Sequence, residues 1–145
     1  MDAVGIAQEV LHSLKVKKKK GLVLELDLRK AYDCIRWDFL RLLLLQIGLS
    51  LPMVNWILGC VSSASFAAII NGGPSGFFKS SRGLRKGCPL SPLLFILVME
   101  GLSLLFLEAH NEGRISGVSL DCLIKICHVL FVDDVLIMNI ASMEE

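Results

Sequence analysis

Two adjacent aspartates, Asp133 and Asp134, lie in the middle of an otherwise apolar stretch that spans residues 128–138. Large apolar and β-branched residues flank the pair on both sides, a pattern that favours two buried strands with the carboxylates at the hairpin tip. Two like charges about 4 Å apart repel by roughly 4 kcal/mol at an effective dielectric constant of about 20, so a divalent cation is the natural partner of such a pair. A chain with seven aspartates also forms adjacent pairs by chance, so the pair alone does not define a site.

A third carboxylate, Asp27, is placed by its strand pattern to join this pair. Residues 21–27 alternate leucine with valine, glutamate and aspartate, which predicts a strand that ends at Asp27. If this strand neighbours the later hairpin, Asp27, Asp133 and Asp134 meet at one edge of a sheet. Oxygen ligands of this kind suit Mg²⁺ or Mn²⁺, and two such ions about 3.5–4 Å apart support an in-line phosphoryl displacement. The chemistry that these carboxylates indicate is nucleotidyl transfer.

The elements that must position these carboxylates follow from the hydrophobic periodicity. Apolar residues at helical spacing predict helices over residues 4–14, 37–47, 52–61 and 91–110. Gly48 is expected as the C-cap of the second helix, Pro52 as the start of the third, and Ser91 as the N-cap of the last. Strand patterns occur at residues 21–27, 65–71, 76–80, 123–131 and 135–140. This order predicts an α+β fold in which helices cover one face of a mainly antiparallel sheet.

The composition is that of a globular chain with a high apolar content. Hydrophobic residues make up 54% of the 145 residues, and no charged residue occurs between Arg41 and Lys79, so a membrane protein is an alternative to consider. Its best candidate segment, residues 51–70, contains proline and several polar residues and runs into the turn signal at 71–74, which argues against a span. Asp2 and Glu9 interrupt any secretory signal. We therefore expect an intracellular protein, of the nucleus or cytoplasm, with no membrane partner.

Three segments carry a more specific signal. They read LELDLRKAYD at residues 24–33, RGLRKGCPLSPLLF at residues 82–95 and FVDD at residues 131–134. In this order and spacing they resemble the reverse transcriptases of non-LTR retrotransposons, the long interspersed element type, especially those of plant genomes. The resemblance extends over about residues 7–140. It implies a polymerase palm-like antiparallel sheet and an RNA-directed DNA polymerase that adds deoxynucleotides to a DNA primer on an RNA template.

The resemblance also implies roles for the carboxylates and for one tyrosine. Asp27 and Asp133 would bind two Mg²⁺ or Mn²⁺ ions, and Asp134 would support the same catalytic site. Tyr32 occupies the position of the family's steric gate, where an aromatic ring leaves no room for a 2′-hydroxyl and so selects deoxynucleoside triphosphates. The alternative for Tyr32 is a packing tyrosine at the start of a helix. Asp33, next to it, is expected either to cap the following helix or to act in the site.

The segment at residues 82–95 is expected to meet the nucleotide and the nucleic acid. Lys86 and Gly87 would bind the incoming nucleotide, since glycine lets the backbone approach a ligand closely. Arg82 and Arg85 would contact phosphates, or would simply solvate a loop. The family generally has glutamine where this chain has Lys86. A lysine lacks the acceptor of the glutamine side chain, so contacts to the nucleotide would differ.

The family's usual aspartate is also replaced in this segment, by Cys88, which cannot supply the lost negative charge.

We expect residues 1–145 to form a single partial reverse-transcriptase domain, mainly palm, without most of the fingers, the thumb or an endonuclease domain. Those missing segments are possible partners in a full-length element. Because orientation contributes roughly 7–11 kcal/mol to catalysis, little stand-alone activity is expected. The alternative function is an inactive remnant that acts at most as a nucleic-acid-binding or interaction module.

Overall fold

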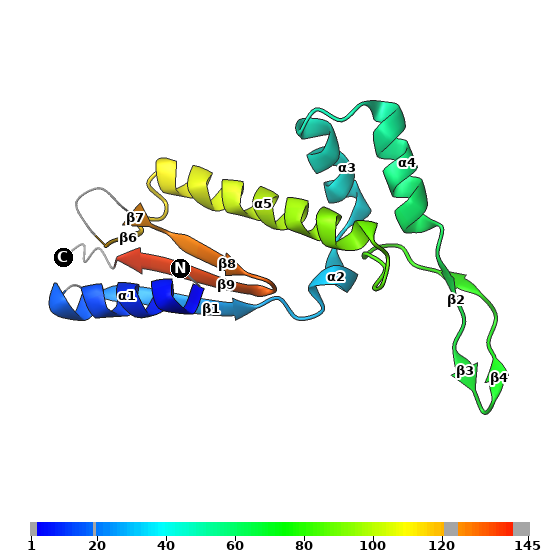
Figure 1. The fold of residues 1–145 in the computed structure, drawn as a ribbon, viewed down its shortest axis with the longest axis horizontal. Coiled ribbons are helices and arrows are strands. Elements are labelled where there is room, and N and C mark those ends of the chain that lie inside the picture. The colour runs from blue at the N-terminus through cyan, green and yellow to red at the C-terminus, as the bar shows by residue number, and fades with distance from the viewer. Residues whose placement is uncertain (1–2, 19, 121–124, 141–145) are drawn as a thin grey trace. The chain divides into compact units, whose positions relative to one another are not determined.

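The computed structural model describes residues 3–18, 20–120 and 125–140 (Figure 1). Its helices are α1 (Ala3–Val16), α2 (Ala31–Cys34), α3 (Trp37–Gln46), α4 (Leu51–Ser62) and α5 (Leu90–Asn111). Its strands are β1 (Gly21–Asp27), β2 (Ser65–Phe66), β3 (Ile69–Ile70), β4 (Gly73–Pro74), β5 (Phe78–Lys79), β6 (Val118–Ser119), β7 (Lys125–Ile126), β8 (His128–Phe131) and β9 (Asp134–Ile140). The chain groups into two compact units, Met1–Arg29 with Met99–Glu145, and Lys30–Val98. The single partial domain expected from the sequence stays a prediction.

The first unit is built on a three-stranded antiparallel sheet in the order β1-β9-β8. Strands β1 and β9 pair along their whole length, from Gly21 opposite Ile140 to Asp27 opposite Asp134. Strand β8 pairs with the first half of β9, so the two strands form the predicted hairpin. A second, two-stranded ladder joins β6 to β7. The α+β class expected from the sequence is therefore confirmed.

Helix α1 packs on this unit through a small buried cluster. Val10 from the helix, Val118 from β6 and Met138 from β9 form its centre, and each side chain is almost completely removed from solvent. Beyond the end of α1, the Lys17 ammonium group donates hydrogen bonds to the backbone carbonyls of Ser119, at 3.0 Å, and of Leu120, at 2.9 Å. Lys17 therefore fastens the end of the helix to the end of β6 and the residue that follows it.

The second half of α5 contacts strand β8 through one histidine. The Ser103 hydroxyl lies 2.8 Å from Nε2 of His128, and the Phe106 ring stacks on the imidazole at a centroid distance of 5.0 Å. Burial lowers the pKa of His128, while the Glu100 carboxylate acts in the opposite direction. The lowered pKa favours the neutral imidazole.

The second unit contains α2, the antiparallel helices α3 and α4, the β2–β5 hairpin and the first half of α5. Leu40 and Leu44 of α3 and Val54 of α4 are completely buried. Gly48 adopts φ 92° after α3, and the amides of Gly48 and Leu49 donate to the carbonyls of Leu45 and Leu44. This is a Schellman ending, so the predicted C-cap is confirmed.

Other predicted helix boundaries have mixed outcomes. Pro52 lies in the first turn of α4, as expected. Helix α5 begins at Leu90 rather than after a Ser91 cap, because the Ser91 hydroxyl donates a 2.6 Å hydrogen bond to the carbonyl of Arg85. The expected hairpin after α4 is present as two short ladders, β2 with β5 and β3 with β4. The N-cap prediction for Ser91 is therefore wrong, because its hydroxyl holds the preceding loop instead.

The candidate membrane span in the structure differs from the segment at residues 51–70 that the sequence analysis considered. Among the described residues one helix, α5, is long and apolar enough to cross a membrane, with mean hydropathy 2.2 over an 18-residue window of which 22% is buried. A core helix of a soluble protein passes the same test, so length and composition alone do not establish a span. The intracellular location stays a prediction.

The buried face of α3 makes a direct test of this packing. Leu44 is completely buried, whereas Leu42, two residues earlier on the same helix, has 66% of its surface exposed. We expect Leu44→Ala to lower the free energy of unfolding by about 2–5 kcal/mol, because it leaves a cavity. Leu42→Ala is the matched control and should change it by no more than about 0.5 kcal/mol. Urea unfolding measures both, and equal losses would contradict the packing described.

Candidate active site

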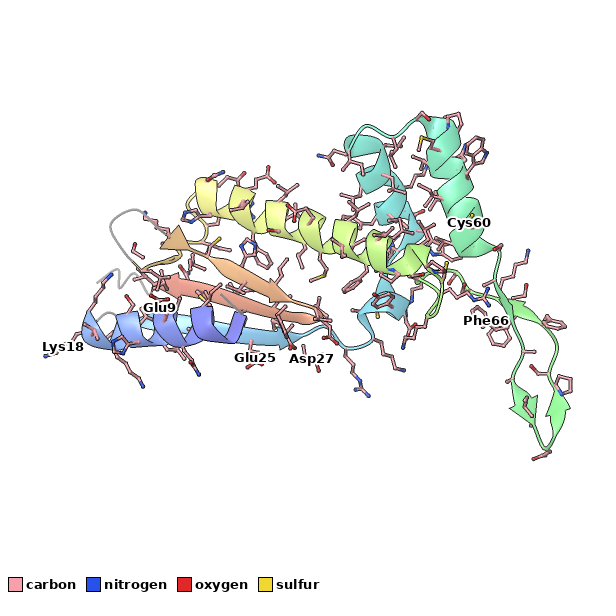
Figure 2. All side chains as sticks on the ribbon, in the orientation of Figure 1. Glu9, Lys18, Glu25, Asp27, Cys60 and Phe66 are labelled. Carbon is pink, nitrogen blue, oxygen red and sulfur yellow. The ribbon has the colours of Figure 1, made fainter. Side chains whose placement is uncertain are left out.

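The three predicted carboxylates come from one edge of the β1-β9-β8 sheet. Asp27 is the last residue of β1, and Figure 2 labels it at the end of this strand. Asp134 is the first residue of β9 and is the register partner of Asp27. The amide of Leu28 donates a 2.9 Å hydrogen bond to the carbonyl of Asp133, which continues the ladder by one step. Directly opposite residues project from the same face with Cβ atoms about 4.5–5.5 Å apart. The expectation that these strands are neighbours is therefore confirmed.

Asp133 lies in a tight turn that links the two strands of the hairpin. Phe131 pairs with Asp134, so Val132 and Asp133 alone form the connection. Val132 has φ 55°, a conformation that is unusual for a β-branched side chain and costs roughly 1–2 kcal/mol. The paired strands on both sides hold the turn in this shape. Strain of this kind often accompanies a functional site.

The donor set at this edge fits a hard divalent cation. Asp27 and Asp133 are exposed and Asp134 is half-buried, so all three offer carboxylate oxygens with access to water and to a ligand. Within residues 3–18, 20–120 and 125–140, however, no three or more His, Cys, Asp or Glu side chains are grouped closely enough to hold a metal ion. The backbone thus brings the aspartates to one edge, while the placed side chains do not form a three-carboxylate cluster.

In the second unit, the loop of residues 82–91, here called the nucleotide loop, packs on α2. The amide of Leu84 donates to the carbonyl of Tyr32, and the amide of Gly83 to that of Ile35, both at 2.8 Å. Gly83 has φ 93°, and a Cβ atom there would lie 3.0 Å from the carbonyl oxygen of Asp33 and 3.1 Å from its Cα. Glycine is therefore required both by the conformation and by the close contact with α2.

Tyr32, the predicted steric gate, is held by an aromatic partner. Its ring stacks on that of Phe95 in α5, with centroids 4.5 Å apart and planes inclined by 15°. Phe95 is buried and Tyr32 is half-buried. The contact fixes the orientation of the tyrosine, which suits both a packing role and a selective one. Sequence reasoning did not single out Phe95, although its position four residues after Ser91 places the two on one face of the helix.

Lys86, the predicted nucleotide ligand, has a carboxylate neighbour. Its ammonium group lies 3.7 Å from a carboxylate oxygen of Asp33, and both side chains are largely exposed. A pair of this kind contributes at most about 1 kcal/mol to stability. Asp33 lies inside α2, and α3 begins after Arg36 with no side-chain cap. The alternative that Asp33 caps the following helix is therefore wrong, and the residue instead faces Lys86.

Cys88 stands where the resemblance leads one to expect an aspartate, and its surroundings favour the anion. The backbone amide of Leu90 lowers the pKa of the thiol most, and Ser91 and the charge of Arg85 act in the same direction, while burial opposes them. A larger fraction of this thiol is therefore ionised near neutral pH than in an ordinary cysteine.

The remaining loop residues named in the sequence analysis are exposed. Arg82, Arg85, Lys86 and Gly87 all face solvent within the described residues, and Gly87 has φ 82° with no heavy atom near the position of a Cβ. The carbonyl of Arg85 accepts the hydrogen bond from Ser91. The loop therefore presents three cations on a backbone that is fastened at Gly83, Leu84 and Arg85.

Residues 2–144 match the family described as reverse transcriptase (RNA-dependent DNA polymerase). The chain belongs to this family. The predicted resemblance to the non-LTR retrotransposon enzymes is likewise confirmed by its relatives.

Those relatives are of two kinds. The chain is 51% identical over 67 residues to an uncharacterized mitochondrial protein of Arabidopsis thaliana, covering 46% of this chain and 55% of that protein. It is 27% identical over 131 residues to a retrovirus-related Pol polyprotein from the type-1 retrotransposable element R2 of Popillia japonica, covering 88% of this chain and 21% of the polyprotein. The corresponding R2 polyprotein of Nasonia vitripennis is 30% identical over 122 residues, which are 83% of this chain and 11% of the polyprotein.

The fold is also similar to a solved structure. An apo telomerase from Candida tropicalis, truncated from its C-terminal domain, superposes with a TM-score of 0.59 at 17% identity, covering 95% of this chain and 29% of the telomerase chain. At this identity the likeness concerns the fold alone. The chain spans about half of the Arabidopsis protein and about a fifth or less of the polyproteins that it matches.

Two glycines of the nucleotide loop test how closely it packs on α2. Gly83 and Gly87 both have positive φ, but only at Gly83 would a Cβ meet backbone atoms, those of Asp33. We expect Gly83→Ala to destabilise the protein clearly more than Gly87→Ala, which carries the conformational cost of roughly 1–2 kcal/mol without the collision. Urea unfolding of the two variants measures the difference. Equal losses would mean that the loop does not rest on α2.

Proposed function

We propose that this chain carries the palm of an RNA-directed DNA polymerase, which adds deoxynucleotides to a DNA primer on an RNA template. One observation carries the proposal: Asp27 and Asp134 are register partners, with Asp133 in the adjoining turn, in a chain that matches the reverse transcriptase family over residues 2–144. The substrates are an RNA template, a DNA primer and deoxynucleoside triphosphates. The chemistry is a nucleotidyl transfer.

In this proposal the three aspartates bind the catalytic ions. Asp27 and Asp133 supply the main carboxylate ligands, and Asp134, opposite Asp27, adds negative charge to the same edge. Two Mg²⁺ or Mn²⁺ ions, when bound, activate the attacking 3′-hydroxyl and stabilise the leaving oxygen. The strands paired on both sides of the two-residue turn, and the hydrogen bond from the Leu28 amide, limit the movement of the Asp133 backbone.

The nucleotide loop and α2 would select and hold the nucleotide. Tyr32, oriented by its stacking on Phe95, excludes a 2′-hydroxyl by its bulk. Lys86 attracts the triphosphate as a point charge, and Gly87 leaves the backbone open to it. Arg82 and Arg85 contact phosphates of the nucleic acid.

A second function is favoured by one contact. Lys86 replaces the family's usual glutamine and faces Asp33 at 3.7 Å, so a carboxylate competes with any triphosphate for its charge. Together with Cys88, this departure fits a catalytically inactive remnant that keeps a nucleic-acid-binding or interaction role. The two functions differ in metal binding and in primer extension.

Metal binding tests the carboxylate edge without requiring activity. Titration of the protein with Mn²⁺, followed by the electron paramagnetic resonance signal of the free ion, should show binding that weakens by roughly tenfold or more in Asp27→Asn and in Asp134→Asn, because each removes an anionic ligand. Glu25→Gln is the matched control, since Glu25 is also exposed on β1 but lies opposite Leu136 rather than a carboxylate. Equal Mn²⁺ affinity in all four proteins would refute the proposed metal site.

Primer extension tests the enzyme itself. With an RNA template, a DNA primer, deoxynucleoside triphosphates and Mg²⁺ or Mn²⁺, we expect slow extension that falls to background in Asp133→Ala, because this variant loses a main metal ligand. Glu25→Gln should extend primers like the unaltered chain. Absence of extension by the unaltered chain would leave the non-catalytic function, and equal extension by Asp133→Ala would identify a contaminating polymerase.

A further inference from the structure

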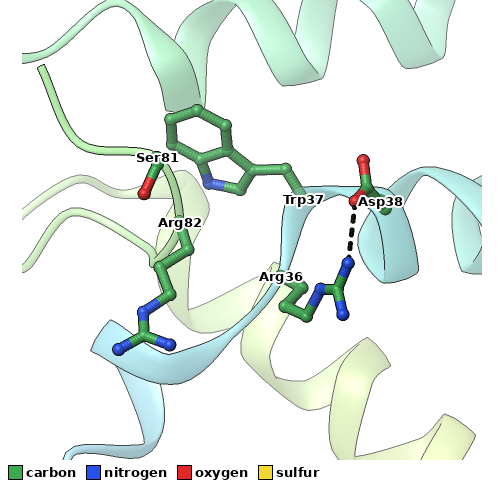
Figure 3. Close-up of a pocket in the computed structure, with 5 residues that line it drawn as sticks. All are labelled: Arg36, Trp37, Asp38, Ser81 and Arg82. Atoms are coloured by element: carbon green, nitrogen blue, oxygen red, sulfur yellow. Dashed lines mark hydrogen bonds and ion pairs between the residues drawn. The ribbon is translucent and has the colours of Figure 1, made fainter.

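A small basic pocket lies in the second unit, away from the residues assigned above except for Arg82. It has a volume of about 380 Å³ and is lined by Arg36, Trp37, Asp38, Ser81 and Arg82 (Figure 3). The first three come from the start of α3 and the last two from the segment after β5. As Figure 3 shows, Ser81 and Arg82 lie on one side of the pocket and Arg36 and Asp38 on the other, and the Trp37 side chain extends toward Ser81.

Two hydrogen bonds join these walls. The indole N–H of Trp37 donates to the carbonyl of Gly83, and the amide of Gly83 donates to the carbonyl of Ile35, each at 2.8 Å. Gly83 is buried and Trp37 is half-buried. The two segments are thus tied together at the residues that flank the arginines, so the backbone around the pocket is held in place without a ligand. A preformed site loses little conformational entropy on binding.

The charges of the pocket favour an anion. Arg36 pairs with Asp38 at 3.2 Å, and their side chains are 75% and 86% exposed. For Arg82, no ion pair is found within the described parts of the chain. Two guanidinium groups and one carboxylate leave a net charge of +1, and the Ser81 hydroxyl adds a hydrogen-bond donor. Guanidinium groups bind phosphate oxygens with a matched pair of N–H donors.

We propose that this pocket binds a backbone phosphate of single-stranded RNA, with the adjoining base against the exposed part of Trp37. The choice of RNA rests on the proposed function. A net charge of +1 holds a small free anion weakly, whereas along a strand this contact adds to that of Arg85 in the same loop. Asp38 competes with the phosphate for Arg36, so it sets how tightly the strand is held.

The test measures binding of the whole chain to a fluorescent single-stranded RNA of about twelve nucleotides by anisotropy, over a range of salt concentrations. Arg36→Gln and Arg82→Gln should each weaken binding several-fold and reduce the slope of log affinity against log salt by about 0.7, the value for one phosphate contact on a single strand. Both arginines are exposed, so the variants should unfold at the same temperature as the unaltered chain.

The chain offers a matched control. Arg114 pairs with Glu112, two residues away, as Arg36 pairs with Asp38, and it is similarly exposed, but it lies in the first unit. Arg114→Gln should leave RNA binding and its salt slope unchanged. Equal losses in Arg36→Gln and Arg114→Gln would overturn the proposal, because they would reflect overall charge rather than this pocket.

The opposite change should have the opposite effect. Asp38→Asn frees Arg36 and should tighten RNA binding several-fold, whereas Glu112→Gln should not. Competition with inorganic phosphate and with a deoxynucleoside triphosphate tests whether the bound phosphate belongs to an RNA strand. If either competitor displaces the RNA at a concentration equal to that of the RNA, the proposal that the pocket binds an RNA strand is overturned. RNA binding is measured without Mn²⁺, so its failure is distinguishable from failure of the metal site or of primer extension.

Discussion

The arrangement of the candidate active site depends on the antiparallel register between β1 and β9. Seven consecutive pairs place Asp27 opposite Asp134, and the Leu28 amide extends the ladder to the carbonyl of Asp133. A slip of one residue would move every side chain of β1 to the other face of the sheet and separate the carboxylates. Val23 of β1, which lies opposite Met138, packs against the same buried cluster as Val10, and a slip would remove it from this cluster. The same strand register therefore determines both the packing of the core and the position of the aspartates.

A second constraint acts at Gly83, which fastens the nucleotide loop. Its amide and carbonyl bond to Ile35 and Trp37, and its missing side chain admits the backbone of Asp33. The same contacts bring Lys86 near Asp33 and close the walls of the basic pocket. One residue without a side chain thus organises both the proposed nucleotide contacts and the proposed RNA contact.

In the nucleotide loop, the chain keeps the backbone contacts but differs from the family's usual residues at positions 86 and 88. The backbone contacts at Gly83 and Leu84 do not depend on the side chains at positions 86 and 88, so they tolerate Lys86 and Cys88. Those two side chains, however, change the charges that a nucleotide would meet. Lys86 is paired with Asp33, and Cys88 offers a thiol in place of a carboxylate. The fold is preserved by the backbone, while catalysis depends on the side chains and is more easily lost.

Much of the architecture was predictable because it is encoded locally. Alternation of side chains predicted β1 and its end at Asp27, and the paired aspartates predicted the hairpin of β8 and β9. Gly48 and Pro52 marked helix ends correctly, since their effects on the backbone are intrinsic to these residues. The predictions of Ser91 and Asp33 as helix caps were wrong. The Ser91 hydroxyl instead bonds to the carbonyl of Arg85, and the Asp33 carboxylate lies near the ammonium group of Lys86.

The sequence by itself determined the segments that carry chemistry, the elements that contain them and the family to which they belong. Only the tertiary structure decided which residues meet across long separations: Asp27 with Asp134, Tyr32 with Phe95, and Trp37 with Gly83. The tertiary structure also decided the basic pocket, since Arg36 and Arg82 lie in separate segments of the chain. The physical reason is that strand alternation and helix capping act between near neighbours in the chain, whereas these contacts form only when distant segments pack together.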